Sequence, residues 1–345
     1  MLASSARLCK LRAGGPWGDA MTLSRRTLLT LTGGAALTAT ARVAWAQAYP
    51  SRPVRIVVGF PPGGSNDLHG RLIAQYLSEK LGQQFFVENR SGAGSSLATE
   101  MVSRAAPDGY TLLLSSSSDS WNATLYSNLK YDFVRDIAPV ASLSDGMGVL
   151  VVHPSFAPRS VPELLAAAKA NPGKITMASA GIGSAPHLYW ELFRTLTGVD
   201  MLHVPYRGGG PAVTDLLAGQ VQAYFSTMPA AIEFIRSGKL RAVAVTGAAR
   251  WEGLPDIPAV AESVPGYEAT SWWGVGAPKD TPPDIIEKLN AEINAGLRND
   301  TNLKQRLADV GSTPLIKTAA EFGKFSAEYT ERWGKVIRTA NIKAE

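Results

Sequence analysis

The chain has 345 residues, of which 45% are hydrophobic and 18% are charged, and its formal net charge is +5. That charge belongs to the N-terminal region: residues 1–46 contain six Lys/Arg and one acidic residue, and the remainder contains 28 of each sign. A neutral remainder lacks the basic surface that nucleic-acid binding requires, so no nucleic-acid partner is expected. The single cysteine, Cys9, lies in the same region. Beyond it, disulfides, zinc–thiolate sites and cysteine nucleophiles are excluded.

Residues 1–46 read as an export signal peptide. Arg25 and Arg26 precede the apolar run Leu28–Ala41, and Ala44-Trp45-Ala46 is a small-x-small cleavage signal. The run is shorter than the ~18 residues of a membrane span. The twin arginine is typical of a Tat signal and also occurs in Sec leaders, so both routes stay open. Since residues 1–20 fit neither signal, Met21 is a candidate start. We expect cleavage near Ala46 and a periplasmic protein.

Strand and helix patterns alternate through most of the remaining chain. The predicted strands are Val54–Phe60, Phe85–Asn89, Thr111–Ser115, Gly148–Val152, Ile175–Ser179, Leu202–Val204, Ala223–Ser226, Ala242–Thr246 and Trp273–Ala277. The predicted helices are Asn66–Leu81, Ser95–Ala106, Val161–Ala170, Pro186–Thr197, Pro211–Ala218 and Ile232–Ser237, with helices only after Pro278. This order predicts an α/β fold with mainly parallel sheets. At this length a single core begins to split, so two domains are expected.

Three of the strand-to-helix junctions contain glycine. They are Phe60–Asp67, Gly181–Ser184 and Tyr206–Gly210. The first N–H groups of a helix lack partners within the helix, and its positive dipole end favours an anion. In α/β sheets such loops gather at the carboxyl ends of strands, where ligands bind. The junctions therefore predict a cradle for a carboxylate or a phosphate, on which all three loops converge.

Motifs for cofactor or metal chemistry are missing from the sequence. It has no phosphate-binding P-loop, no H-E-x-x-H, no G-x-S-x-G and no calcium loop, and Gly181–Pro186 fails the dinucleotide fingerprint at its last glycine. The four histidines show no metal-ligand spacing. No cofactor, metal or catalytic residue is predicted.

Several polar or aromatic residues near the loops allow two interpretations. His187 either faces the ligand or is a hydrogen-bonded structural residue, and Asp67 and Asp215 either brace their loops or position a ligand group. The hydroxyl-rich run Ser115–Ser118 forms either a carboxylate-binding end of a strand or a solvated turn. Trp272-Trp273 forms either an aromatic wall of the site or part of the core.

Eight motifs in register resemble one family. They are Phe60–Asp67, Leu81–Gln83, Val87–Gly94, Pro107–Leu113, His203–Gly208, Gly238–Thr246, Leu254–Glu262 and Ser271–Pro278. Each is weak alone, but together they make residues 50–340 similar to the substrate-binding proteins of tripartite tricarboxylate transporters, the Bug or TctC family. Pro62, Ser65-Asn66 and the serine run depart from the commonest family pattern. These departures leave the identity of the substrate open.

The resemblance implies a periplasmic binding protein of type II-like architecture with a ligand cleft between two domains. Domain 1 would comprise residues 49–150 and 270–345, and domain 2 residues 151–269. The ligand would be a di- or tricarboxylate, an acidic amino acid or an aromatic acid, delivered to membrane permease subunits of TctA/TctB type. The expected ligand-binding residues are Phe60, Gly63, Gly64, Asp67, Ser116, Gly183, Ser184, His187, Tyr206 and Gly208.

Two other functions stay open on the sequence. An exported hydrolase would use Ser184, or a serine of 115–118, with His187, although the chain lacks the nucleophile elbow of such enzymes. A sensor for a two-component system would use the same ligand cleft without transport. The sequence does not separate the sensor from the transport receptor.

Overall fold

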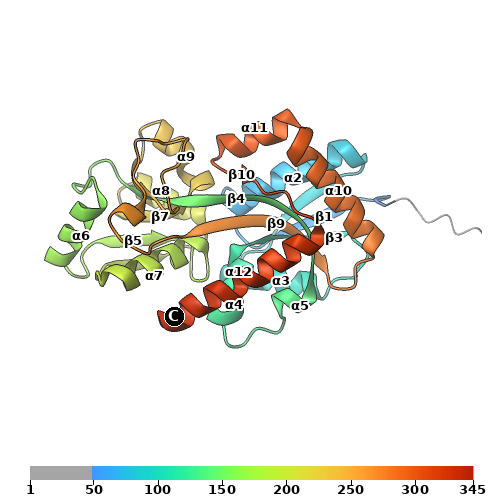
Figure 1. Ribbon diagram of the computed structural model, residues 1–345, viewed down its shortest axis with the longest axis horizontal. Coiled ribbons are helices and arrows are strands. Elements are labelled where there is room, and N and C mark those ends of the chain that lie inside the picture. Colours follow the sequence, from blue (N-terminus) through green and yellow to red (C-terminus); the bar gives the residue numbers. More distant parts are fainter. Residues whose placement is uncertain (1–48, 345) are drawn as a thin grey trace, which may run out of the picture. The chain divides into compact units, whose positions relative to one another are not determined.

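The computed structural model describes residues 49–344, and these residues form an α/β fold (Figure 1). The strands are β1 Val54–Val58, β2 Phe85–Asn89, β3 Thr111–Ser116, β4 Ile137–Val152, β5 Thr176–Ser179, β6 Leu202–Pro205, β7 Ala223–Thr227, β8 Arg241–Val245, β9 Thr270–Pro278 and β10 Thr313–Pro314. The helices are α2 Ser65–Leu81, α3 Ser96–Ser103, α4 Ser117–Leu125, α5 Phe133–Asp136, α6 Val161–Ala170, α7 Ala185–Thr197, α8 Gly209–Leu217, α9 Met228–Arg236, α10 Pro283–Asn299, α11 Thr301–Asp309 and α12 Ala319–Thr339. The predicted export signal lies outside the described residues.

The strands are ordered β2-β1-β3-β9-β4-β7-β5-β6, and β8 and β10 also pair with β4. The α/β prediction is confirmed. The sheet is nevertheless mixed: β1 is parallel to β2 and β3, and β5 is parallel to β6 and β7, whereas every pair that includes β4 or β9 is antiparallel. The expectation of mainly parallel pairing therefore holds only at the two ends of the strand order.

The long strand β4 joins two groups of strands. Its first part, Ile137–Met147, pairs with β9, and its last part, Gly148–Val152, pairs with β7 and β8. Figure 1 shows β4 and β9 running side by side between the groups. The sequence predicted only Gly148–Val152, because Pro139, several serines and Gly146 have low strand propensity. Pairing with the long β9 outweighs that propensity.

The serine run after β3 is not a solvated turn. Ser115 and Ser116 end β3, and Ser117 begins α4, a helix that the sequence did not predict. All are buried. Within α4, Asp119 accepts a hydrogen bond from the backbone N–H of Ser116 (2.8 Å) and one from the Thr99 hydroxyl (2.6 Å). Asp119 thus satisfies a helix N-terminus that local propensity disfavours.

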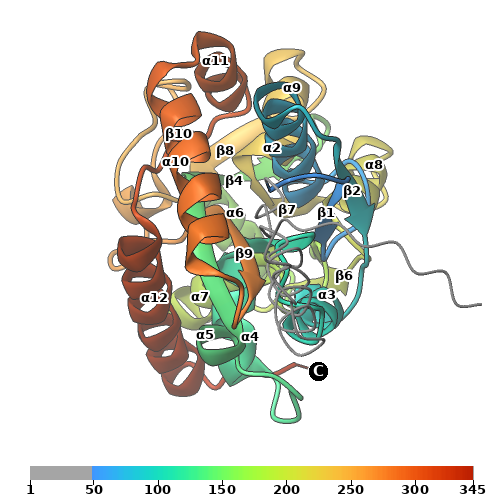
Figure 2. The same ribbon diagram turned by 90° about the vertical axis from the view of Figure 1, so that its right-hand side faces the viewer.

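Helices cover both faces of the sheet (Figure 2). Helix α12 packs on α4, where the rings of Trp121 and Trp333 lie 5.2 Å apart. Phe322, Tyr329 and Ile337 on the same helix are also buried. Among residues 49–344, no helix is long and apolar enough to cross a membrane.

Candidate functional site

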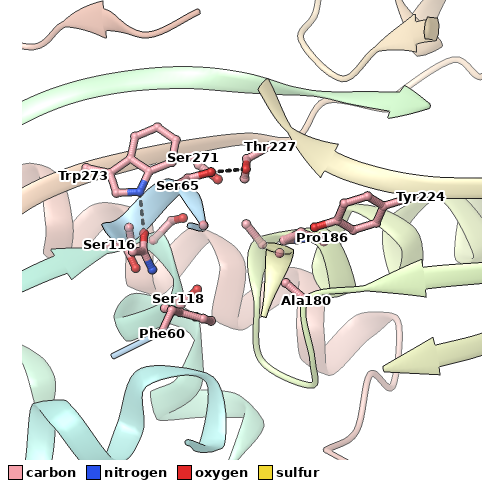
Figure 3. A pocket seen from close by; sticks show the side chains of 15 residues that line it. Phe60, Ser65, Ser116, Ser118, Ala180, Pro186, Tyr224, Thr227, Ser271 and Trp273 are labelled. Carbon is pink, nitrogen blue, oxygen red and sulfur yellow. Dashed lines mark hydrogen bonds between the residues drawn. The ribbon is translucent and has the colours of Figure 1, made fainter. Parts of the chain in front are cut away.

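Five helices begin around one small cavity of about 40 Å³ (Figure 3). The helices are α2, α4, α7, α8 and α9, and each contributes its first residues or its N-cap to the wall. The lining residues are Phe60, Gly64, Ser65, Asn66, Ser116, Ser117, Ser118, Ala180, Ala185, Pro186, Gly209, Tyr224, Thr227, Ser271 and Trp273. No charged side chain is among them. The positive ends of five helix dipoles therefore meet at an uncharged, hydroxyl-rich cavity, and this arrangement favours an anion.

Hydroxyl groups in the cavity wall remain free to bind a ligand. Ser116 Oγ and Tyr224 OH are buried and have no hydrogen-bond partner among the described residues. A buried polar group without a partner costs about 1–3 kcal/mol, which a ligand oxygen would recover. The hydroxyls of Ser65 and Thr227 bond each other, one from each strand group.

The two adjacent tryptophans have different roles. Trp272 packs in the core against Phe322, whereas Trp273 lines the cavity. Trp273 Nε1 donates to Asn66 Oδ1 (2.5 Å), and its ring stacks on His69 with centroids 4.1 Å apart and planes 7° apart. Trp272 is therefore part of the core, and Trp273 is part of the cavity wall.

His69, which stacks on Trp273, is itself held in place by two hydrogen bonds. Its Nδ1 lies 2.8 Å from the Ser65 carbonyl oxygen, and its Nε2 lies 3.2 Å from Ser312 Oγ. The carbonyl can only accept, so Nδ1 carries the proton and Nε2 accepts from the serine. Burial lowers the pKa of His69 to about 4, which keeps the ring neutral near pH 7.

We predict that His69 makes stability fall in mild acid. Between its ordinary pKa of 6.5 and the folded value of about 4, the unfolded chain binds a proton that the native protein does not. The contribution of His69 to the free energy of unfolding is therefore fully present above about pH 6.5. It decreases as the pH falls towards 4, by about 3 kcal/mol in total. Denaturant unfolding from pH 7.5 to 4 should give a flatter curve for His69→Gln than for the wild type. Parallel curves would contradict the assignment.

Three of the residues expected to bind ligand, Phe60, Gly64 and Ser116, line the cavity. Phe60 also lines a second cavity, of about 500 Å³, together with Tyr206. The other expected residues line neither cavity: they are Gly63, Asp67, Gly183, Ser184, His187 and Gly208. The sequence carried no signal for Tyr224 or Thr227. Thr227 is the last residue of β7, just before α9, at a strand-to-helix junction like the other three but without glycine, and Tyr224 lies three residues earlier in the strand.

Asp67 braces the first loop. Its carboxylate accepts hydrogen bonds from the Gly63 N–H (3.0 Å), Arg71 Nε (2.9 Å) and Asn89 Nδ2 (2.9 Å). Burial acts to raise the pKa of Asp67, but the bonds from Arg71, Asn89 and Gly63 outweigh it and lower the pKa overall. The carboxylate thus stays ionised and holds Gly63 in its left-handed conformation (φ 83°). Asp215 braces the third loop in a similar way, because its carboxylate accepts a hydrogen bond from Tyr206 OH (2.7 Å).

His187 and Ser184 do not form a catalytic pair. His187 Nδ1 accepts from the Gly183 N–H (3.4 Å), and its ring stacks on His203 at 5.1 Å. Burial lowers the pKa of His187 to about 3. Ser184 Oγ donates to the Gly181 carbonyl (2.5 Å). Within residues 49–344, neither Ser184 nor any serine of 115–118 bonds a histidine, so the serine–histidine pair expected for the hydrolase alternative is not formed.

The loops of the two strand groups touch beside the cavities. Trp121 Nε1 donates to the Gly183 carbonyl (2.7 Å), and Tyr126 OH donates to the Ile182 carbonyl (3.2 Å). Gly208 is so close to Pro61 that an added Cβ would lie 2.8 Å from Pro61 Cδ. Gly183 and Gly208 therefore act in the contact between the groups rather than in the cavity wall.

Comparison with known proteins identifies the family. A family model described as the tripartite tricarboxylate transporter family receptor matches residues 70–342, well over half of the chain. The chain belongs to this receptor family. The receptor is 41% identical over 301 residues to protein BugT of Bordetella pertussis, which covers 86% of this chain and 92% of BugT. The family resemblance inferred from the eight motifs is confirmed.

Two solved structures with bound ligands are also similar to this receptor. The R. palustris protein Rpa4515 with adipate is 36% identical, with a TM-score of 0.83 and coverage of 86% of this chain and 99% of that chain. MatC from Rhodopseudomonas palustris with bound malate is 31% identical, with a TM-score of 0.80 and coverage of 84% and 100%. The predicted fold of a periplasmic binding protein of type II-like architecture is thereby confirmed.

Proposed function

We propose that this receptor captures a small organic carboxylate in the cavity where the five helices begin. The observation that carries the proposal is the convergence of five helix N-termini on a wall without a charged side chain. Free N–H groups and hydroxyls are the donors that a carboxylate requires, and each is stronger in a cavity that excludes water.

A carboxylate explains the site better than a phosphate. The sequence alone left both anions open. The adipate and malate named for the two similar structures are carboxylates, which supports the first. The lining also has no Lys or Arg to balance the second charge that phosphate carries near neutral pH.

Binding and closure are coupled in this proposal. We propose that domain 1 comprises residues 49–150 and 270–345 and domain 2 residues 151–269, so that the boundary falls near the end of β4. Helices α2 and α4 would bind the ligand from domain 1, and α7, α8 and α9 from domain 2. A ligand that touches both domains shifts the population towards the closed state.

The closed receptor would then deliver its ligand to the membrane. The family description names a transporter, so we propose that integral-membrane permease subunits receive the carboxylate. The N-terminal signal predicted from the sequence supports the periplasm as the compartment of this step. The protein acts by binding and release, without a catalytic step.

A thermal-shift screen of the protein without its leader tests the function. A carboxylate at 100 times its Kd should stabilise the fold by about 2.7 kcal/mol and raise the Tm accordingly. Inorganic phosphate and uncharged amides of the same acids are the matched controls. The proposal fails if no carboxylate raises the Tm, or if phosphate raises it more than every carboxylate.

A further inference from the structure

Two carbonyl groups in the loop before α7 accept hydrogen bonds from α4 and its C-cap residue. The loop follows β5, in one strand group, and α4 follows β3, in the other. The donors are Trp121 Nε1, which bonds the Gly183 carbonyl (2.7 Å), and Tyr126 OH, which bonds the Ile182 carbonyl (3.2 Å). Both bonds therefore connect one strand group to the other.

The N–H ends of the same two peptide groups are bonded within their own strand group. The Gly183 N–H shares a peptide group with the Ile182 carbonyl, and it donates to His187 Nδ1 (3.4 Å). The Ser184 N–H shares one with the Gly183 carbonyl, and it donates to the Gly181 carbonyl (3.1 Å). A trans peptide directs its N–H and C=O in opposite directions, so these bonds direct both carbonyls towards α4. Because they do not involve α4, the loop is a preformed pair of acceptors.

The two surfaces meet too closely for a ligand to lie between them. A Cβ atom added to Gly94 would lie 3.0 Å from Gly183 Cα, and one added to Gly183 would lie 2.6 Å from Asn122 Oδ1. Trp121 is completely buried and lines neither of the two cavities. Its N–H therefore bonds protein and not ligand, in a contact that excludes water and so strengthens the bond.

Both sides of this contact continue directly into the small cavity. Helix α4 begins at Ser117, which lines that cavity, and Trp121 lies about one turn later. Gly183 immediately precedes Ser184, the N-cap of α7, and Ala185 lines the same cavity. The contact therefore fixes the N-termini of α4 and α7 relative to each other at the place where the cavity needs both.

We propose that Trp121 and Tyr126 form a latch that holds the cleft closed and positions the N-terminus of α7 opposite that of α4. This inference rests on the proposed function. The latch consists of protein groups alone, so it stabilises the closed state with or without a ligand. Apparent affinity rises with the fraction of receptor that is closed, so the latch strengthens the binding of every ligand by the same factor. Trp121 is thus a positioning residue, which acts on the ligand through α7.

Calorimetric titration with adipate and with malate, the acids named for the two similar structures, tests the latch. Trp121→Phe removes the donor and keeps an aromatic ring. We expect it to weaken the binding of both acids by the same factor, about tenfold. Trp333→Phe is the matched control, because Trp333 packs on Trp121 and its Nε1 has no partner among the described residues. Its affinities should stay within about twofold of the wild type.

A tyrosine pair repeats the comparison with a smaller change. Tyr126→Phe removes only the hydroxyl that bonds Ile182, and it should weaken both acids about threefold. Tyr131→Phe removes a buried hydroxyl that has no partner within residues 49–344, and its affinities should equal those of the wild type. This pair decides the question if Trp121→Phe does not fold.

Small-angle scattering of the ligand-free receptor tests the latch without any acid. The double variant Trp121→Phe/Tyr126→Phe should have a larger radius of gyration than Trp333→Phe/Tyr131→Phe, because its closed state is less populated. Each double variant removes one indole N–H and one phenol hydroxyl, so the chemical change is the same. Denaturant unfolding checks that both are folded.

The outcomes separate the latch from the proposed function. Equal losses of affinity in Trp121→Phe and Trp333→Phe would overturn the latch, because loss of core packing would then explain both. Different factors for adipate and malate in Trp121→Phe would overturn it as well. If the wild type binds neither acid, that result counts against the proposed function, and the scattering comparison decides the latch: equal radii overturn it.

Discussion

Replacing Gly64 by leucine is expected to weaken carboxylate binding at least about 100-fold, or about 2.8 kcal/mol. Gly64 lines the small cavity where the five helices begin, and it is the N-cap of α2. A Cβ atom there would lie 3.8 Å from the backbone nitrogen of Gly209, which is an ordinary contact. The further atoms of leucine would either fill the cavity or push the first residues of α8 away. Titration with the best acid from the thermal-shift screen measures the loss.

Gly64→Ala is the matched control for that experiment. Gly64 has φ −89°, a conformation that every residue adopts, so neither change strains the backbone. Alanine adds only the Cβ atom, and we expect at most a few-fold loss of affinity. The Tm of both ligand-free variants should stay close to the wild type. Unchanged affinity in Gly64→Leu would remove the first loop from the site.

Gly208→Ala is expected to weaken binding by about 30-fold through a different mechanism, namely obstruction of closure (about 2 kcal/mol). Gly208 has φ 146°, and its added Cβ would lie 2.8 Å from Pro61 Cδ. The methyl group therefore both strains the backbone, by about 1–3 kcal/mol, and separates the two loops. A closed state that forms less often lowers the apparent affinity in proportion to its population. Calorimetry measures the affinity, and denaturant unfolding measures the stability.

Gly219→Ala separates strain from obstruction. Gly219 also has a positive φ (71°), but an added Cβ there meets open space. We expect this variant to lose stability and to keep the affinity of the wild type. Equal losses of affinity in Gly208→Ala and Gly219→Ala would show that general destabilisation, not closure, explains the effect.

Most helices and strands were predictable from local patterns. Val161–Ala170 and Phe85–Asn89 match their predicted bounds, because a capped amphipathic helix and a β-branched, aromatic strand carry their signals within a few residues. The strand β4 and the helix α4 were not predictable in this way. Their residues have poor local propensity, and partners far along the chain stabilise them, β9 for the strand and α12 for the helix.

The candidate site, too, was predictable from local patterns only in part. The glycine loops marked where helices begin, and Phe60 and Gly64 do line the small cavity at those helix N-termini. The roles of Asp67, Trp273 and Thr227 depend on neighbours that are distant in the sequence: Asn89, His69 and Ser65. No local pattern contains those neighbours, so the sequence left two interpretations of Asp67 and of the tryptophan pair and gave no signal for Thr227.

By itself, the sequence determined the α/β alternation, the neutral charge beyond residue 46, the loops that precede helices and the family. These properties depend on residue types and short spacings, which the chain carries whether folded or not. Only the tertiary structure decided that five helix N-termini surround one cavity whose lining, among the described residues, has no charged side chain. The physical reason is that dipoles and charges act over a few ångströms in space, and β4 and β9 bring together loops that lie more than a hundred residues apart in the chain.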